Sequence, residues 1–479
     1  MVDPLPGAPR PARPRPAHWP DSGLDVPALR RAGLRPTPFS QFVLKIAARC
    51  NLLCDYCYVY NHADTTWRTA PRFMEPDTVR TAAERIARHA QEHDIRTVRI
   101  SLHGGEPLLA GPERIAGTVG TLRSVLRSVA PSAAVEFTVQ TNGTLLDRDW
   151  LETLARLDVK VAVSLDGDAA THDLHRRDLR GRPTRAETER GLRLLASDPY
   201  RPWYAGLLAV VDPAADPAAF YESLLDFAPP RMDLLLPHAT WDRPPSRRTA
   251  PGSAEYADWL LRIFDLWYAA PVAPTRIRLF ESVIGLLLGG RAEGESVGLA
   301  PLAYLIIDTD GAYRQSEALN TAYDGCSGTG RDVRGAALDE LFDLPGVAAR
   351  QIGREALSEQ CHACELERIC GGGHYGHRYR TGTGFKNPSV YCPDLTQLIR
   401  RIADRLAADL APELATDIAT DLTAEFAAPS GMSGTSAPDS PSGADGPRGS
   451  ASSVESARAT ARPRSRTSAP PTREVRAMC

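Results

Sequence analysis

The sequence predicts an α/β protein in which a parallel sheet with covering helices is followed by a small cysteine-rich module and a closing helix. Three observations lead to this fold class. Short apolar runs alternate with helical patterns over residues 41–288, the pattern changes near residue 300, and seven of the nine cysteines fall in two groups or close behind the second. Because strands joined by helices pair in parallel, the first region forms a parallel barrel or an open doubly wound sheet.

The strands and helices follow in order along the chain. Helical patterns over residues 75–93, 111–128, 148–157 and 187–197 separate the strands, and a helix-rich segment runs from 254 to 288. Two strand-like runs then flank Asp310-Gly311, a dipeptide typical of hairpins, so a new module begins near residue 300. Six apolar runs are typical of buried parallel strands: residues 41–47, 97–103, 135–141, 159–165, 204–211 and 232–238.

These patterns divide the chain into five parts. Low-complexity ends rich in Pro and Arg, or in Ser, Pro, Gly and Ala, have little to pack, so we expect them to be flexible. The parts are a flexible arm over 1–38, the sheet region with its helical bridge over 39–299, the cysteine-rich module over 300–395, a C-terminal helix over 396–427 and a disordered tail over 428–479.

Composition excludes several classes of function. The formal net charge is -3, so no global field attracts nucleic acid or an anionic membrane. No apolar run reaches the roughly 18 residues of a membrane-spanning helix, and the N-terminus lacks the apolar stretch of a secretion signal. We therefore expect a cytoplasmic protein, in which grouped cysteines hold metals or do redox work rather than form disulfides.

The first cysteine group, CNLLCDYC, follows the first predicted strand directly and supplies Cys50, Cys54 and Cys57. Such loops at the carboxyl ends of strands carry the chemistry of parallel barrels. Three thiolates can hold three irons of a [4Fe–4S] cubane and leave the fourth iron open for a chelating ligand. A zinc site or buried thiols are the alternatives; a structural zinc wants a fourth ligand, for which His62 is available.

Two landmarks then make the sequence recognisable. Tyr56 stands just before the last cysteine, and HGGEP, with Gly104, Gly105, Glu106 and Pro107, follows the second strand. Together they resemble the signature of the radical S-adenosylmethionine (SAM) superfamily. The resemblance implies a partial (β/α)6 barrel in which the three cysteines hold the cluster and GGEP binds the amino group of SAM. Glycines permit close backbone approach, and Glu106 offers a carboxylate to an ammonium.

Two further strand ends fit the same plan. VQTNG places Gln140 and Asn142, and VSLDG places Ser164 and Asp166, at the carboxyl ends of the third and fourth strands. The resemblance implies that these residues face the ribose of SAM and the substrate. Turn formation is the alternative, since Asn-Gly and Asp-Gly are favoured turn pairs.

The second cysteine group comprises Cys361, Cys364, Cys370 and Cys392. Its C-x2-C-x5-C spacing with a later cysteine resembles the SPASM extension of peptide-modifying radical SAM enzymes, which holds two auxiliary clusters on seven cysteines. Here Ser316 and His374 stand at two expected cysteine positions. The resemblance therefore implies one auxiliary [4Fe–4S] cluster, with a structural zinc as the competitor.

The C-terminal third, with ICGGGHYGHRYRTGTGFKNPSVYCPDL, looks like the FxsB-type maturases, which crosslink an aromatic ring to the Cβ of a nearby residue in a precursor peptide, forming a cyclophane. The partners implied are that precursor peptide and an electron donor such as flavodoxin or ferredoxin. Glu317 is the expected general base, because related enzymes carry an aspartate there; Glu281 and Asp166 are reserves. The alternatives are a thioether, an epimerised residue, a sulfatase formylglycine, or a zinc-stabilised peptide-binding protein without catalysis.

Overall fold

The structure, a computed structural model, describes residues 18–250 and 252–426, the last 16 of these in backbone only. The chain forms two compact units, 1–415 and 416–479. All the strands and both cysteine groups lie in the first unit. The expected tail over 428–479 and residues 1–17 of the expected arm lie outside the described residues.

All six predicted parallel strands are present. Each pairs in parallel with the next, for example Val43 with Ser101 and Leu102 with Val139. Both faces of β1 are largely buried, which explains its nearly continuous apolar sequence. The strands are β1 (Gln41–Ala47), β2 (Thr97–Gly104), β3 (Ala134–Thr141), β4 (Val159–Ser164), β5 (Tyr204–Val210) and β6 (Arg231–Leu235).

The sheet is open. Its strand order is β10-β9-β8-β1-β2-β3-β4-β5-β6-β7, so β10 and β7 (Arg276–Ile277) are its edges and the sheet does not close into a barrel. The α/β class with a parallel sheet is therefore confirmed, as a partial barrel. Because all six central strands point the same way, their carboxyl ends gather the loops of the site at one edge.

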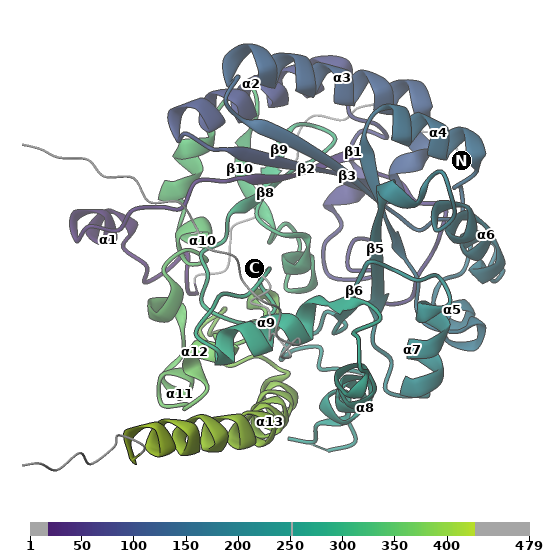
Figure 1. The fold of residues 1–479 in the computed structure, drawn as a ribbon. Coiled ribbons are helices and arrows are strands. Elements are labelled where there is room, and N and C mark those ends of the chain that lie inside the picture. Colours follow the sequence, from purple (N-terminus) through teal and green to yellow (C-terminus); the bar gives the residue numbers. More distant parts are fainter. Residues whose placement is uncertain (1–17, 251, 427–479) are drawn as a thin grey trace, which may run out of the picture. The chain divides into compact units, whose positions relative to one another are not determined.

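Helices cover the outer side of the sheet. Figure 1 shows α2, α3 and α4 lying along one side of the strands. The inward stripe of α2 includes Val79, Ala83 and Ile86, all buried at i, i+4 and i+7 spacing. The helices are α2 (Pro76–Glu92), α3 (Pro112–Val129), α4 (Arg148–Arg156), α5 (Ala169–His175), α6 (Arg185–Leu195), α7 (Pro217–Leu225), α8 (Glu255–Ala269) and α9 (Arg278–Leu287).

The predicted hairpin forms, but it extends the main sheet. β8 (Tyr304–Ile307) pairs in parallel with β1 and antiparallel with β9 (Ala312–Arg314), which pairs with β10 (Gly328–Asp332). Short helices follow: η4 (Glu317–Thr321), η5 (Leu338–Asp343), α10 (Pro345–Ala348), η6 (Gly353–Ala356), α11 (Glu359–His362), α12 (Glu367–Cys370) and η7 (Tyr375–Arg378). The closing helix, α13 (Cys392–Phe426), begins four residues before the prediction and contains the last auxiliary cysteine.

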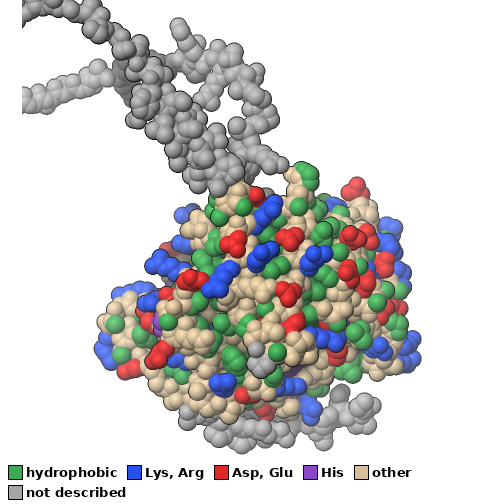
Figure 2. All heavy atoms as spheres, turned by 90° about the horizontal axis from the view of Figure 1, so that it is seen from below, with side chains coloured by type: hydrophobic (Ala, Val, Ile, Leu, Met, Phe, Trp, Pro, Cys, Tyr) green, Lys and Arg blue, Asp and Glu red, His purple; other side chains and the backbone are tan. Residues whose placement is uncertain are grey.

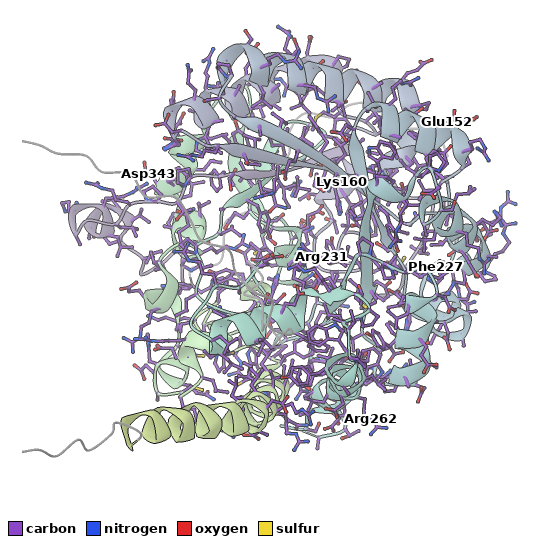
Figure 3. The ribbon with its side chains drawn as sticks, in the orientation of Figure 1. Glu152, Lys160, Phe227, Arg231, Arg262 and Asp343 are labelled. Carbon is purple, nitrogen blue, oxygen red and sulfur yellow. The ribbon has the colours of Figure 1, made fainter. Side chains whose placement is uncertain are left out.

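The expected flexible arm over 1–38 is wrong for residues 18–38. Asp25 caps α1 (Val26–Arg31) by accepting the Ala28 N–H at 2.8 Å. Arg30 of this helix pairs with Asp343 at 3.2 Å, and Figure 3 labels Asp343 beside α1. His18 is buried against the module, with its ring 5.5 Å from that of Tyr379. Aromatic packing and a capped helix thus order a segment whose Pro/Arg composition suggested disorder.

The surface carries no dominant charge on the face in Figure 2, where basic and acidic side chains are interspersed. This mixture agrees with the small net charge. Among the residues that the structure describes, no helix has the length and apolar character needed to span a bilayer.

Candidate active site

The first cysteine loop follows β1, as predicted. Cys50, Cys54 and Cys57 are all half-buried. Burial raises the pKa of Cys50 to about 12 and that of Cys54 to about 11, and the neighbouring thiols add to both shifts. The three sulfurs therefore lie close enough to repel one another as thiolates. A bound cationic centre would lower these thiol pKa values and offset the repulsion, because coordination to a metal deprotonates a thiol.

The two glycines of HGGEP hold this loop in place. The Gly105 N–H donates to the Ala47 carbonyl at 2.9 Å, and the next amide donates to the Arg49 carbonyl at 3.0 Å. A Cβ on Gly104 would lie 2.0 Å from the Ala47 oxygen, and one on Gly105 would lie 2.0 Å from Tyr60 Oη. Only glycine allows this approach, so the segment fixes the backbone that leads into the cysteines.

Glu106 is fully buried and accepts three hydrogen bonds. Its Oε1 accepts from the Leu108 amide at 3.0 Å and Thr141 Oγ1 at 2.7 Å, and its Oε2 accepts from the Asn142 amide at 2.8 Å. Burial nevertheless raises its pKa to about 7. The carboxylate thus ties β2 to the end of β3, and Oε2 retains acceptor capacity for an ammonium. Pro107, also buried, opens the short η2 helix (Pro107–Ala110).

The side chains at the ends of β3 and β4 bond to each other and to the cysteine loop. Gln140 Nε2 donates to Ser164 Oγ at 2.9 Å. Asn142 Nδ2 donates to Asn51 Oδ1 at 2.9 Å and lies 3.8 Å from Cys50 Sγ. The structure therefore brings together the first cysteine loop, HGGEP and both strand ends predicted from the sequence.

Asp166 connects the aromatic residue of the cysteine motif to the sheet. It accepts hydrogen bonds from Tyr56 Oη, from Arg176 Nε at 2.8 Å and from the Val210 amide at 2.9 Å. Burial alone would raise the pKa of Asp166, but the Arg176 charge and these bonds lower it. The Arg176 guanidinium also lies 5.6 Å from the centre of the Tyr56 ring. Sequence reasoning missed Arg176, which no motif marks.

Glu317 lies beside the first cysteine loop, at the start of η4. It is buried, with Oε1 2.6 Å from Lys45 Nζ and Oε2 3.9 Å from His103 Nδ1. Burial raises the pKa of Tyr58, the neighbour of Cys57, and the Glu317 carboxylate adds to this rise. Lys45 points from β1 to the sheet face opposite the helices and also lies 3.6 Å from Asp308.

The four cysteines of the second group gather although they come from separate segments. Burial raises the pKa of Cys370 to about 12, and the charges of Cys392 and Cys361 add to the shift. Burial also raises the pKa of Cys392, and the charges of Cys361 and Cys364 add to this rise. Arg378 stabilises the connecting glycine loop by donating to the Gly371, Gly372 and Gly373 carbonyls at 2.6 to 3.1 Å.

Ser316 and His374, the two departures from the expected cysteine pattern, meet at one oxygen. Glu295 Oε1 lies 3.4 Å from Ser316 Oγ and 3.1 Å from His374 Nε2. Sequence reasoning did not single out Glu295, which lies in a loop without a motif. Cys326 packs in a small apolar cluster. The reserve base Glu281 lies on α9 and is held by Arg276 at 3.0 Å.

Comparison with known proteins finds a family match over the part of the chain that contains this site. The radical SAM superfamily model matches residues 44–202, which include the first cysteine loop and HGGEP. The chain is 23% identical over 343 residues to a cysteine-type anaerobic sulfatase-maturating enzyme of Clostridium perfringens, covering 70% of this chain and 88% of that protein. It is 24% identical over 379 residues to a serine-type counterpart of Klebsiella aerogenes, covering 75% and 87%.

Solved structures share the fold. Native anSMEcpe with bound AdoMet superposes with a TM-score of 0.65 at 20% identity, over 78% of this chain and 99% of that one. Streptococcus suis SuiB bound to precursor peptide SuiA gives 0.51 at 14% identity, over 76% and 78%. The likeness extends past the matched domain into the cysteine-rich module. Residues 44–202, which contain the cysteine loop and the HGGEP segment, match the radical SAM superfamily, so this part of the chain is a radical SAM domain.

Proposed function

We propose that the chain is a radical SAM maturase that oxidises a side chain of a polypeptide substrate, with formylglycine formation from cysteine or serine as the reaction best supported. The observation that carries the proposal is the similarity to both cysteine-type and serine-type sulfatase-maturating enzymes over at least 70% of this chain. The same similarity favours an enzyme over the non-catalytic alternative.

The residues present fit the cofactors. Cys50, Cys54 and Cys57 would hold a [4Fe–4S] cluster, with HGGEP and the ends of β3 and β4 around SAM. When bound, the cluster and SAM supply a 5'-deoxyadenosyl radical that removes a hydrogen atom from the substrate. Reduction of the cluster needs an external one-electron donor, for which flavodoxin or ferredoxin remains our expectation.

The second cysteine group fits a cluster better than a zinc ion. A tetrahedral zinc with Zn–S bonds of about 2.3 Å needs sulfurs about 3.8 Å apart. Within the described ranges, no three cysteine sulfurs all lie within 4.8 Å of one another. A cubane spreads its thiolates farther apart, because each binds a different iron. This spacing supports one auxiliary [4Fe–4S] cluster on Cys361, Cys364, Cys370 and Cys392.

The proposed oxidation removes one hydrogen atom, one electron and one proton from the substrate. Loss of a hydrogen atom from Cβ leaves a carbon radical. Release of one electron and the hydroxyl proton turns a serine into formylglycine; a cysteine gives a thioaldehyde, which water hydrolyses with release of hydrogen sulfide. The electron needs an acceptor, which we assign to the auxiliary cluster. Glu317 is the base we propose, because it is a buried carboxylate beside Cys57.

The cyclophane crosslink is the second candidate. The observation in its favour is the replacement of two pattern cysteines by Ser316 and His374, which departs from a pattern with two auxiliary clusters. The carbon radical would add to an aromatic ring, and loss of one electron and one proton would restore aromaticity. Glu317 would serve the same role, so the base does not distinguish the two products.

The test is an anaerobic assay of the reconstituted enzyme with three peptides, which carry a target cysteine, a target serine, or an aromatic residue near an aliphatic one. Serine oxidation and crosslinking both remove two hydrogens, so mass alone cannot separate them. Capture by a hydrazide probe reports the aldehyde. Aldehyde on the cysteine or serine peptide supports formylglycine formation, and loss of two hydrogens without capture supports the crosslink. Cleavage of SAM without modification of any peptide would contradict a peptide substrate of either kind.

A further inference from the structure

Three histidines form a compact cluster outside the SAM site. His238 follows β6, whereas His374 and His377 come from the glycine-rich segment after Cys370. One ring nitrogen of each lies within 4.8 Å of the corresponding nitrogens of the other two. The segments are joined by a direct contact of 3.1 Å between His238 Nδ1 and His377 Nε2. The loop after β6 thus meets the cysteine-rich module through imidazoles.

The spacing fits a shared metal ion. Metal–nitrogen bonds of about 2.0–2.1 Å place two imidazole nitrogens about 2.9 Å apart at a right angle and about 3.4 Å apart at a tetrahedral angle. The observed 3.1 Å lies between these values. A simple hydrogen bond between His238 and His377 would explain the 3.1 Å distance, but it does not explain why a third imidazole lies beside them. The centre of the His374 ring is 4.8 Å from that of His377 and 5.2 Å from that of His238.

Both ring nitrogens of His374 have a hydrogen-bond partner. Its Nδ1 accepts the Gly376 N–H at 3.2 Å, so Nε2 carries the ring proton and a metal ion would bind Nε2 in place of that proton. That atom lies 3.1 Å from Glu295 Oε1. Glu295 is itself held by Arg350 and by Tyr304 Oη at 2.5 Å. The Glu295 carboxylate thus fixes the orientation of the His374 ring, and a metal ion at Nε2 would release the proton that the two groups share.

The ligand set selects a class of ion. Three imidazoles with an adjacent carboxylate suit zinc and other divalent transition metals, whereas iron–sulfur clusters take thiolates. The cluster lies close to the first cysteine loop, since the His238 ring is 5.0 Å from that of Tyr58.

We propose that His238, His374 and His377 bind one divalent transition-metal ion, which releases the proton between His374 and Glu295. The ion ties the loop after β6 to the cysteine-rich module. This proposal does not rest on the substrate or on the proposed reaction. Zinc is the probe, because it has no redox chemistry and its absorption edge is separate from that of iron.

The experiment uses the full chain with its clusters reconstituted anaerobically. The protein is freed of adventitious metal with a chelator, mixed with one equivalent of zinc and passed through a desalting column. Zinc and iron per chain are then measured, together with zinc X-ray absorption and the melting temperature. The variants are His377→Gln, His238→Gln and the control His93→Gln. His93 caps the C-terminal end of α2 and forms the other histidine group with His89 and Asp339.

We expect the wild type and His93→Gln to retain one zinc with only nitrogen and oxygen neighbours, and zinc to raise the melting temperature. Retained zinc should fall at least tenfold in His238→Gln and His377→Gln, with iron content unchanged. If His377→Gln, which alters a buried residue, loses iron as well, the more exposed His238→Gln decides. Sulfur neighbours, zinc retention in His238→Gln, zinc loss in His93→Gln alone, or no retained zinc in the wild type would overturn the proposal.

Discussion

Replacing Gly105 by alanine tests whether the HGGEP segment positions the first cysteine loop. The new Cβ would lie 2.0 Å from Tyr60 Oη and 2.5 Å from the Arg49 carbonyl oxygen. The tyrosine hydroxyl can move, but the carbonyl is part of the loop that leads to Cys50 and accepts the Glu106 amide at 3.0 Å. The substitution must therefore push the two backbones apart.

The expected cost follows from overpacking, which typically destabilises by about 1–3 kcal/mol. With an unfolding entropy of about 2.1 cal/mol/K per residue, a unit of 415 residues loses roughly 1 °C of Tm per kcal/mol. We expect Gly105→Ala to lower the Tm by about 1–3 °C. The same displacement moves the backbone before Cys50, so iron bound per chain should also fall.

Two matched variants separate this effect from a general intolerance of alanine. A Cβ on Gly117, exposed on α3, would meet nothing within 4 Å, so Gly117→Ala should stabilise by about 0.5–1 kcal/mol and leave iron unchanged. Adding Tyr60→Phe to Gly105→Ala removes the contact with Oη but keeps that with Arg49, so rescue should be partial. Thermal melts and iron analysis under anaerobic conditions measure both effects. A Gly105→Ala protein with wild-type Tm and iron content would refute the reasoning.

Three further predictions concern the site. Cys54→Ala should abolish formation of 5'-deoxyadenosine, because the cluster loses a ligand; retained cleavage of SAM would contradict the assignment. Glu317→Gln should preserve 5'-deoxyadenosine but lower modified peptide about 10²–10⁴-fold, the usual contribution of a positioned base. Glu281→Gln is its control, and wild-type product from Glu317→Gln would exclude that base. Hydrogen bonds to Asp212 and Asp55 raise the pKa of His175 from 6.5 to about 9. The stabilisation that protonated His175 provides is complete below pH 6.5 and is lost as the pH rises through 9. The Tm of the wild type should therefore fall between these pH values, and the Tm of His175→Gln should fall less steeply. Equal slopes of Tm against pH in the two proteins would count against the ion pairs.

The sequence allowed the central strands to be predicted because each is a short, mostly apolar run, which the structure buries almost continuously in β1 and at alternate residues in β2, β3 and β4. It did not reveal β7, which is two residues long, or β10, whose sequence GTGRD is polar and rich in glycine. Both strands exist because a neighbouring strand offers them hydrogen bonds. Helix α1 is a different case, since Asp25 two residues before Pro27 is a local start signal that the Pro/Arg composition of the arm obscured.

Some residues of the site are marked by short sequence motifs, whereas others are identified only by contacts between distant segments. Cysteine spacings and strand ends lie within short segments, so the residues of the first loop, HGGEP and both strand ends could be named in advance. Arg176 and Lys45 could not be named, because each acts on a partner from another element: Asp166 and Glu317 respectively. A buried charge is stable only when such a partner is present, and that pairing exists only after the chain has folded.

Ser316 and His374 show why departures from a pattern should be considered together. In the sequence they are two separate losses of a cysteine, 58 residues apart. In the structure both contact Glu295 Oε1, and Tyr304 Oη donates to the same oxygen. A carboxylate at this position would repel nearby thiolates, whereas it accepts hydrogen bonds from a hydroxyl and an imidazole. A single cysteine at either position would therefore place its thiol beside this carboxylate, so the serine, the histidine and the glutamate form one hydrogen-bonded unit whose members depend on one another.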